Sequence, residues 1–447
     1  MMKQNNPLRR LLAALLAALT LVSFTILPVL GAAEDEAADT EAAETMEATA
    51  PKAEETEMEI ISISTEDDLI ALAASCTLDA WSREKHVVLE ADLDLTGLTF
   101  SPIATFGGTF DGQGHALLNC KMTGALTSDN QVYGLFGILK GATVRNLVLG
   151  AESGDTGSFT VSGNGTTSTG VIAGACVDSK IEKCTSYLPM VCEGNNSANK
   201  LMTMGLVGFV YGAGTSEDTV SQLTDLTNYG ALKADPGAAN ANGFTSTQVG
   251  GIAGFSNTSR TSTFANRFLR CINHGDMTVS TGRASGIVAA ANRYTHLTDC
   301  TNYGLNDNAF PRSGYARLGN ITCITGPGIK FTNVVNRGDL ISRTKGAAGG
   351  ILCLVNHNDN EFIGCESYGR VISDRPDNDY KGTFFGQCKK AAKFRNCIAQ
   401  GDVGTYNGGD CIMTGVNADN YMDYLGAYDA SAVDVTPANI LYRPAGN

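Results

Sequence analysis

The residues best suited to chemistry are a few Asp and His side chains set among glycines. Asp111 and His115 stand four residues apart in a glycine-rich stretch, and a carboxylate beside an imidazole can act in general acid–base catalysis. Asp276, Asp339 and Asp402 recur at equivalent places of a repeat, and glycoside hydrolysis needs two carboxylates about 5 to 9.5 Å apart. Turn formation explains all five more simply, because Asp and Gly favour turns. We therefore assign no catalytic residue.

Metal and cofactor chemistry lacks the usual spacings. The five His residues show neither an HxxxH nor an HxH pattern, which a metal site on a helix or strand would need. No Ser stands in a GxSxG elbow, and no glycine-rich stretch continues into Gly-Lys-Ser/Thr. We expect no metal ion and no cofactor. The five His residues are His86, His115, His274, His296 and His357.

These residues lie within a repeated pattern. Each unit has a Gly-bracketed apolar segment, such as 249–255, a variable loop, a second apolar segment and then Asn-aromatic-Gly, as in 302–304. The units recur about nine times at spacings of roughly 27 to 45 residues, which is typical of a solenoid. The second segments align Cys120, Leu147, Cys184, Leu226, Cys271, Cys300, Val334, Cys365 and Cys397 in one column.

The repeats predict β-structure rather than helices. Their apolar runs are short, rich in β-branched residues and bounded by Gly, Asn and Asp, and no run shows a sustained 3.6-residue period. We therefore predict an all-β fold, a right-handed parallel β-helix of about nine coils, with variable loops along one side. An Asn column (228, 273, 302, 336) predicts a side-chain ladder across the coils, and a Gly column (230, 275, 304, 338, 369, 401) predicts turns with positive φ.

A further column carries planar side chains. It lies one residue before the corner glycine and contains Tyr229, His274, Tyr303, Arg337 and Tyr368. Equivalent positions of a solenoid lie on one line, so these groups form a stripe on one face. Arg337 in this column favours an exposed stripe, whose planar faces can stack on a ligand ring. The alternative is that these residues pack the corners of the coils.

The chain ends predict export and capping. Residues 1–33 have a basic start, an apolar run and a small-residue exit, as in a secretory signal peptide. Residues 34–59 hold eleven acids and one base and predict a disordered spacer. The β-helix spans 60–405, with an N-terminal cap at 60–100 that includes a short helix after Thr65. Residues 406–447 lose the repeat and predict a C-terminal cap or irregular segment.

The thirteen Cys residues predict mostly free thiols. Most share columns with Leu, Val or Gly, so Cys behaves as a small hydrophobic residue in a stack. Cys323 and Cys353 share a second column, replacing Gly254 and Gly174 of sister repeats. Neighbouring coils place such pairs within disulfide range, but parallel Cα–Cβ vectors suit the bond poorly.

Several stretches between Ile61 and Leu149 resemble a family of secreted bacterial β-helix proteins with GLUG repeats, within the pectin-lyase-like superfamily. The resemblance implies the fold, but such domains occur in adhesins, in other surface proteins and beside enzyme modules. The superfamily's polygalacturonase-like enzymes use Gly-His-Gly and Arg-Ile-Lys, and the nearest stretches here, 273–276 and 328–330, lack the first Gly and the Arg. Asp374 to Asp379 has the ingredients of a calcium site in a lyase, or of a polar turn. The matching stretches are 63–69, 91–95, 102–103, 110–115 and 134–137.

Together these features favour a secreted or cell-surface, adhesin-like binding protein over an enzyme. An elongated solenoid suits multivalent contact with a polysaccharide or a host or cell surface. The alternatives are a polysaccharide lyase or glycoside hydrolase with an unrecognised site, and a structural spacer. The net charge of −14 and the lack of a basic block beyond the N-terminus exclude a nucleic-acid partner. We expect a monomer with no membrane contact once the signal peptide is removed.

Overall fold

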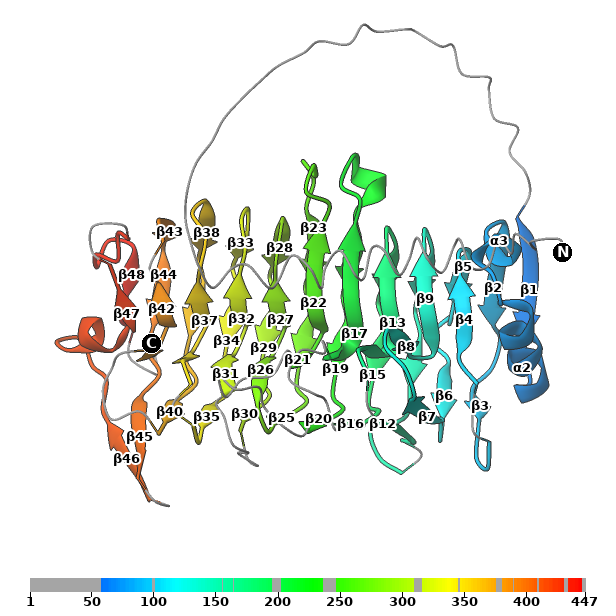
Figure 1. Ribbon diagram of the computed structural model, residues 1–447, viewed down its shortest axis with the longest axis horizontal. Coiled ribbons are helices and arrows are strands. Elements are labelled where there is room, and N and C mark those ends of the chain that lie inside the picture. Colours follow the sequence, from blue (N-terminus) through cyan, green and yellow to red (C-terminus); the bar gives the residue numbers. More distant parts are fainter. Residues whose placement is uncertain are drawn as a thin grey trace, which may run out of the picture. The chain divides into compact units, whose positions relative to one another are not determined.

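The computed structural model describes residues 58–98, 101–154, 156–163, 165–194, 202–235, 247–308, 316–344, 346–374, 380–388, 390–407, 410–429 and 433–443. The signal peptide at 1–33 and nearly all of the acidic spacer at 34–59 lie outside these residues. The compact unit spans Glu59–Asn447. It is a parallel β-helix, as predicted, and its coils follow one another from the blue to the red end of the colour scale in Figure 1.

Four sheets, here named A to D, run along the stack. Sheet A contains β1 (Glu59–Ile63), β2 (Lys85–Leu89), β5 (Thr109–Asp111), β10 (Thr143–Arg145), β14 (Lys180–Glu182), β18 (Gln222–Thr224), β23 (Asn266–Leu269), β28 (Thr295–Thr298), β33 (Lys330–Thr332), β38 (Asn360–Ile363) and β43 (Ala392–Arg395). Sheet B contains β3 (Leu93–Asp94), β6 (Ala116–Leu118), β11 (Val148–Leu149), β15 (Thr185–Ser186), β19 (Thr227–Asn228), β24 (Ile272–Asn273), β29 (Thr301–Asn302), β34 (Val335–Asn336), β39 (Glu366–Ser367), β44 (Cys397–Ala399) and β48 (Ile440–Leu441).

Sheet D contains β7 (Lys121–Leu126), β12 (Ser158–Gly163), β16 (Met190–Gly194), β20 (Leu232–Asp235), β25 (Met277–Val279), β30 (Asn306–Asp307), β35 (Leu340–Ser342), β40 (Val371–Ser373), β45 (Val403–Asn407) and β46 (Asp410–Thr414). Sheet C contains β4 (Ile103–Phe106), β8 (Gln131–Tyr133), β9 (Phe136–Lys140), β13 (Thr167–Val177), β17 (Met202–Gly212), β21 (Thr247–Gly250), β22 (Ala253–Thr258), β26 (Gly282–Ser285), β27 (Val288–Ala291), β31 (Ala316–Gly319), β32 (Thr322–Thr325), β36 (Ala348–Gly349), β37 (Leu352–Val355), β41 (Lys381–Gly382), β42 (Phe385–Cys388) and β47 (Ala427–Tyr428).

Each coil passes through the sheets in the order C, A, B, D. The strands β9, β10, β11 and β12, for example, lead into β13, which pairs in parallel with β9. Connection lengths vary on both sides of sheet C. Between sheets C and A they run from Ala291–Thr295 to Gly212–Gln222, and between D and C from Val279–Gly282 to Asp235–Thr247. The expectation of variable loops on one side was therefore wrong, because both edges of sheet C carry them.

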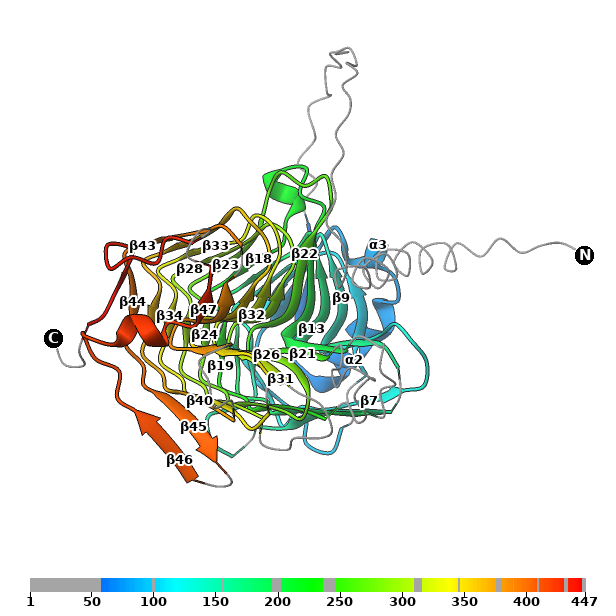
Figure 2. The same ribbon diagram turned by 60° about the vertical axis from the view of Figure 1, so that its left-hand side comes forward.

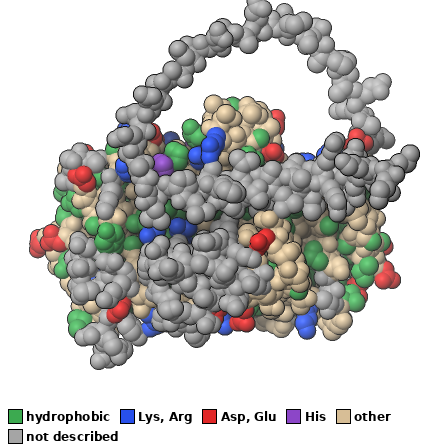
Figure 3. All heavy atoms as spheres, viewed as in Figure 1, with side chains coloured by type: hydrophobic (Ala, Val, Ile, Leu, Met, Phe, Trp, Pro, Cys, Tyr) green, Lys and Arg blue, Asp and Glu red, His purple; other side chains and the backbone are tan. Residues whose placement is uncertain are grey.

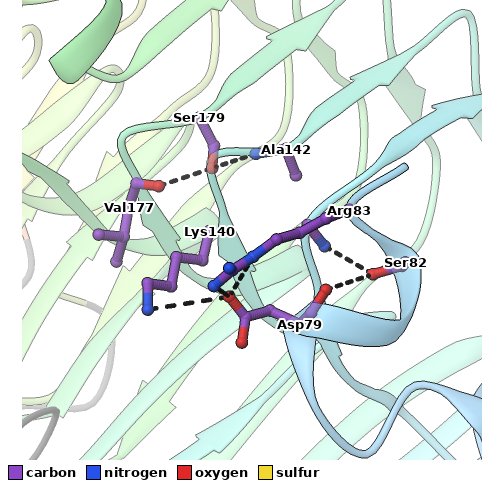
Figure 4. Close-up of polar contacts among 8 residues, drawn as sticks. Asp79, Ser82, Arg83, Lys140, Ala142, Val177 and Ser179 are labelled. Atoms are coloured by element: carbon purple, nitrogen blue, oxygen red, sulfur yellow. Dashed lines mark hydrogen bonds and ion pairs between the residues drawn. The ribbon is translucent and has the colours of Figure 1, made fainter. Parts of the chain in front are cut away.

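Helices cover the N-terminal end of the stack, as predicted. The helix α2 (Glu66–Ser75) begins after Thr65, whose side chain and that of Asp68 form a reciprocal capping box. Leu69 and Leu72 of α2 are buried in the main core. The short helix α3 (Asp79–Ser82) is tied to the first coils, because the buried Asp79 carboxylate pairs with Arg83 and with Lys140 of β9 at 3.8 Å (Figure 4).

The C-terminal residues continue the stack in part. The strands β45 and β46 form an antiparallel hairpin at the edge of sheet D, drawn in orange in Figure 2. A 3₁₀ helix, η2 (Tyr421–Tyr424), precedes β47, which joins sheet C, and β48 joins sheet B. The segment 406–447 therefore combines capping with a partial extra coil. Another 3₁₀ turn, η1 (Glu217–Thr219), lies between β17 and β18.

The predicted Asn ladder is confirmed. The amide nitrogen of Asn228 donates to Asn273 Oδ1 at 2.8 Å, Asn273 to Asn302 at 2.9 Å, and Asn302 to Asn336 at 3.2 Å. Each of these amides also donates to the carbonyl oxygen two residues later. All four side chains are buried. The ladder thus satisfies buried polar groups and holds the register of the coils.

The Gly column has a different cause from the one predicted. None of its six glycines has positive φ. A Cβ on Gly304 would instead lie 2.1 Å from the carbonyl oxygen of Gly275, and a Cβ on Gly338 would meet Gly304 in the same way. The prediction of positive φ was wrong: glycine is needed here because successive coils approach closely at this corner.

Positive φ occurs at another corner, between sheets A and B. Eight residues there have φ between 51° and 62°, and seven of them are not glycine. Asn and Asp, which make up five of the eight, tolerate this conformation better than most residues. We call this column the ridge: Asn146, Lys183, Asp225, Arg270, Asp299, Asn333, Gly364 and Asn396.

The Cys column is confirmed from Leu147 onward but not at Cys120. The amide of Val148 bonds to the carbonyl of His115, as Thr185 bonds to Leu147, so His115 holds this place in the first coil. All thirteen thiols are free, and only Cys411 is exposed. Burial raises the pKa of the Cys184 thiol to about 12. The thiols therefore act as small core groups.

Candidate functional site

The outer face of sheet B carries the planar residues predicted from the sequence. Side chains alternate in and out along each strand, so the residue after each buried ladder position points outward. The amides of the aligned residues bond to the preceding coil, as in Tyr229 N to Ser186 O and Tyr303 N to Asn273 O, both 2.7 Å. We call these six residues the planar column: Tyr187, Tyr229, His274, Tyr303, Arg337 and Tyr368.

Four members of the planar column form a continuous ring stack. The ring centroids are 4.8 Å apart for Tyr187 and Tyr229, and 4.7 Å apart for both Tyr229–His274 and His274–Tyr303. The planes differ by only 4° to 6°. Further along, the Arg337 guanidinium lies 4.9 Å above the ring of Tyr368. The spacing equals that of strands in a sheet, so the coil repeat itself sets the stack.

This arrangement changes what the rings offer a ligand. Tyr229 and Tyr303 are 45% and 47% exposed, so they are not buried corner-packing residues. Both faces of Tyr229 are nevertheless covered, by Tyr187 and His274. The expected stacking of a ligand on open ring faces is therefore not available there. The exposed part of the stack is its outer rim of ring edges, phenol hydroxyls and imidazole nitrogens.

The electrostatics of the planar column follow from this packing. Burial between two rings lowers the pKa of His274. Burial, together with the Glu366 carboxylate, raises the pKa of Tyr368, whose hydroxyl donates to Glu366 Oε2 at 2.6 Å. At neutral pH the rim therefore presents neutral donors and acceptors, with one permanent cation at Arg337.

Two other columns complete a strip along the solenoid. The ridge bounds it on the side of sheet A, where Arg270 and Asp225 form an ion pair at 2.6 Å and Asn333 bonds to Asp299 at 3.1 Å. Between the ridge and the planar column lie short side chains that point outward. These floor residues are Val148, Thr185, Thr227, Ile272, Thr301 and Val335, and Glu366 takes the same position in the coil of Tyr368. We call the ridge, floor and planar column together the strip.

A hollow of about 300 Å³ lies at the N-terminal end of the strip, lined by residues from three coils. The carboxylate of Asp111 is held there by three donors: the Arg145 guanidinium at 2.8 Å, Asn146 Nδ2 at 3.0 Å and the backbone N–H of Gln113 at 2.9 Å. Burial opposes ionisation of Asp111, but these bonds outweigh it and hold its pKa below the usual range. The lining consists of Asp111, Gln113, Gly114, Asn146, Val148 and Lys183.

The acids considered for catalysis have structural partners. Asp276 accepts from the amide of Leu305, Asp339 from that of Arg370 and Asp402 from that of Val416, at 2.8 to 3.0 Å. His115 pairs with Asp92 at 3.1 Å. Of the segment from Asp374 to Asp379, residues 375–379 lie outside the described residues. The described acids thus serve turns and coil contacts.

The described part of the chain shows neither a metal-binding cluster nor a membrane-spanning helix. It contains no group of three or more His, Cys, Asp or Glu side chains arranged to hold a metal ion. Acidic and basic side chains are interspersed over the surface seen in Figure 3. No helix among the described residues is long and apolar enough to cross a membrane.

Comparison with known proteins adds little to this picture. No protein-family model and no curated protein matches the chain. A crystal structure of a protein described as a putative immunoglobulin A1 protease from Bacteroides ovatus is similar at a TM-score of 0.40 and 14% identity. The match covers 76% of this chain and 85% of that protein. Membership of the GLUG-repeat family therefore remains a prediction.

Proposed function

We propose that the protein is exported and binds an extended carbohydrate polymer along the strip, without cleaving it. The observation that carries the proposal is the planar column, in which six successive coils place a planar or hydrogen-bonding side chain at one outward position. Residues 1–33, which resemble a signal peptide, support a place outside the cell, where such polymers occur.

The form of the strip favours a polymer over a compact ligand. Its contacts repeat with every coil and are shallow, so a single small molecule would meet few of them. A long chain can touch several coils at once, and modest contacts then add through a high effective concentration. The rim of hydroxyls, imidazole and guanidinium suits a ligand rich in hydroxyl groups.

The ring stack supports binding by holding the rim rigid. Each stacked pair contributes about 0.5 to 1.5 kcal/mol beyond the area it buries. Tyr187, Tyr229 and Tyr303 therefore keep their hydroxyls in fixed positions before a ligand arrives. Groups fixed in advance lose less entropy on binding.

The acids favour binding over hydrolysis. A glycosidase needs a proton-donating acid and a second carboxylate. Among the residues lining the hollow Asp111 is the only acid, and its lowered pKa suits a permanent carboxylate rather than a proton donor. The repeat-borne acids such as Asp339 already bond to backbone amides.

The test removes the hydroxyls and keeps the rings. A variant with Tyr187→Phe, Tyr229→Phe and Tyr303→Phe retains the stack, so its thermal midpoint should match that of the wild-type protein. Tyr428→Phe, in β47 of sheet C, is the matched control. Both are compared with the wild type on a glycan array and by titration with the polysaccharide that binds.

We expect the triple variant to bind at least about tenfold more weakly, since three hydrogen bonds of about 0.5 kcal/mol or more each are lost. The Tyr428 variant should bind normally. Equal binding by the triple variant and the wild type would show that the stack serves only to join the coils. Release of reducing ends or unsaturated products from the polysaccharide would show that the protein cleaves its ligand, and would contradict the proposal.

A further inference from the structure

The hollow beside Asp111 is formed by a local change in the first full coil. Later coils turn from sheet A to sheet B through a single ridge residue, but here the chain turns through Gln113 and Gly114, with φ of 50° and 86°. Gly112 stays close to the next coil, since a Cβ on it would lie 2.5 Å from Asn146 O. A Cβ on Gly114 would meet nothing within 4 Å, so the turn leaves open space.

The groups around this space differ in how many hydrogen bonds they already make within the protein. The Asp111 carboxylate already accepts three hydrogen bonds and acts as a fixed part of the wall. The side-chain amide of Gln113 and the ammonium of Lys183 make no hydrogen bond to any described residue, although the charge of Lys183 helps to lower the pKa of Asp225 on the ridge. Val148 adds an apolar surface. Two polar groups that lack a hydrogen-bond partner in the described residues, together with one apolar group, therefore line this open hollow, and small-ligand sites combine groups of these kinds.

The hollow is continuous with the strip. Val148 is the first floor residue, and it pairs with Thr185 of the next coil. Lys183 is a ridge residue and lies in the coil that begins the planar column at Tyr187. A polymer lying on the floor would therefore run into the hollow at its N-terminal end.

We propose that the hollow is a subsite for one pyranose unit, whose ring lies against Val148 while Gln113 and Lys183 donate hydrogen bonds to its oxygens. This inference rests on the proposed function, and it names the place where the strip recognises an individual sugar rather than an extended surface. A volume of about 300 Å³ is at the lower end for ligand pockets, which suits one sugar unit.

The test uses substitutions that the backbone accepts. Gln113 and Lys183 both have positive φ, so Gln113→Gly and Lys183→Gly remove the side chains without strain. Asp359, with φ of 66°, is exposed between β37 and β38 and lies outside the strip, so Asp359→Gly is the matched control. Cellobiose, lactose, diacetylchitobiose and maltose are the probes, because a disaccharide is too short to use the whole planar column.

We expect at least one of these disaccharides to bind the wild-type protein and to shift the methyl signals of Val148 in NMR spectra. The Gln113 and Lys183 variants should each weaken that binding by about tenfold, whereas the Asp359 variant should not. No binding by any of the four, or binding without a shift at Val148, would overturn the proposal. So would unchanged binding in both hollow variants.

The outcomes separate this subsite from the binding proposed for the strip. If the triple Tyr→Phe variant binds the polymer normally while Lys183→Gly weakens disaccharide binding, the hollow is a site and the planar column is not. If the triple variant fails and the hollow variants bind normally, the strip binds polymer without this subsite.

Discussion

Glycine is needed in this fold either because two coils approach closely or because the backbone has positive φ. Exchanging glycine for asparagine at two corners distinguishes these reasons. Gly304 belongs to the column where coils approach closely, and Gly364 belongs to the ridge, with φ of 62°. Asparagine tolerates positive φ but still carries a Cβ. We expect Gly304→Asn to destabilise the protein strongly and Gly364→Asn to leave its stability nearly unchanged.

The magnitude follows from the contacts at Gly304. A Cβ there would lie 2.1 Å from Gly275 O, and ordinary contact begins at 3.4 Å, so the coils must separate locally by about 1.3 Å. That shift would break the bond from Tyr303 N to Asn273 O at 2.7 Å and the ladder bond from Asn273 to Asn302 at 2.9 Å. At about 1 kcal/mol for each bond, with some overpacking strain, the expected loss is about 2 to 4 kcal/mol.

At Gly364 the added side chain meets little resistance. Its Cβ would lie 2.6 Å from the side-chain oxygen of Asn333 and in ordinary contact with Asn333 Cα at 3.8 Å, and the Asn333 side chain can turn away at the cost of one exposed hydrogen bond to Asp299. Asn333 and Asn396 already hold asparagine at the equivalent positions, with φ of 52° and 53°. The change should therefore fall within about 0.5 kcal/mol of the wild type, or stabilise slightly by restricting the unfolded chain.

Urea unfolding gives the midpoints, and hydrogen exchange locates the weakened coils. For Gly304→Asn, faster exchange should be confined to the coils on either side of residue 304, because a solenoid's contacts are between neighbours. The reasoning fails if Gly304→Asn unfolds within about 0.5 kcal/mol of the wild type, or if Gly364→Asn costs more than Gly304→Asn.

Three further predictions concern thiols, the core and pH. A thiol reagent should label one Cys, Cys411, in the native protein and all thirteen after denaturation, since only Cys411 is exposed; fewer than thirteen on denaturation without reductant would reveal disulfides. Cys300→Asp should destabilise by several kcal/mol because it places a charge in a fully buried position, whereas Cys300→Ala should cost much less, as urea midpoints would show. Burial lowers the pKa values of His274, His296 and His357 below the unfolded value of about 6.5, so the unfolded chain binds more protons and stability should fall as the pH drops from 7 towards 5. His274→Phe keeps the ring stack and should flatten part of that slope; greater stability at pH 5 would mean instead that the neighbouring Tyr rings hold an imidazolium by cation–π attraction.

Several features of the fold could be predicted because they depend on repetition. The Asn ladder from Asn228 to Asn336 and the capping box at Thr65 each follow from residue type and spacing, and both have the contacts expected. The alignment also brought Tyr229, His274 and Tyr303 to one outward line. In a solenoid, equal positions in successive repeats must be neighbours, so sequence alignment amounts to a contact map.

Other features required the coordinates. The ridge column mixes Lys183, Asp225 and Arg270 at positive φ, and only its enrichment in Asn and Asp hinted at that conformation. Cys120 is not in the predicted column because it lies five residues beyond His115, between β6 and β7, where its carbonyl accepts from the amide of Ser158. An alignment by residue type cannot distinguish two buried Cys positions in different parts of a coil.

The sequence alone therefore determined the coil type, the inward and outward columns and the candidate stripe. Only the tertiary structure decided that Gly304 is needed for a close approach rather than for its φ, that the rings cover one another's faces, and that a hollow opens beside Asp111. The physical reason is that these three features depend on distances between atoms of different coils. Residue types set which groups align, but the spacing of about 4.8 Å between coils decides which of them touch.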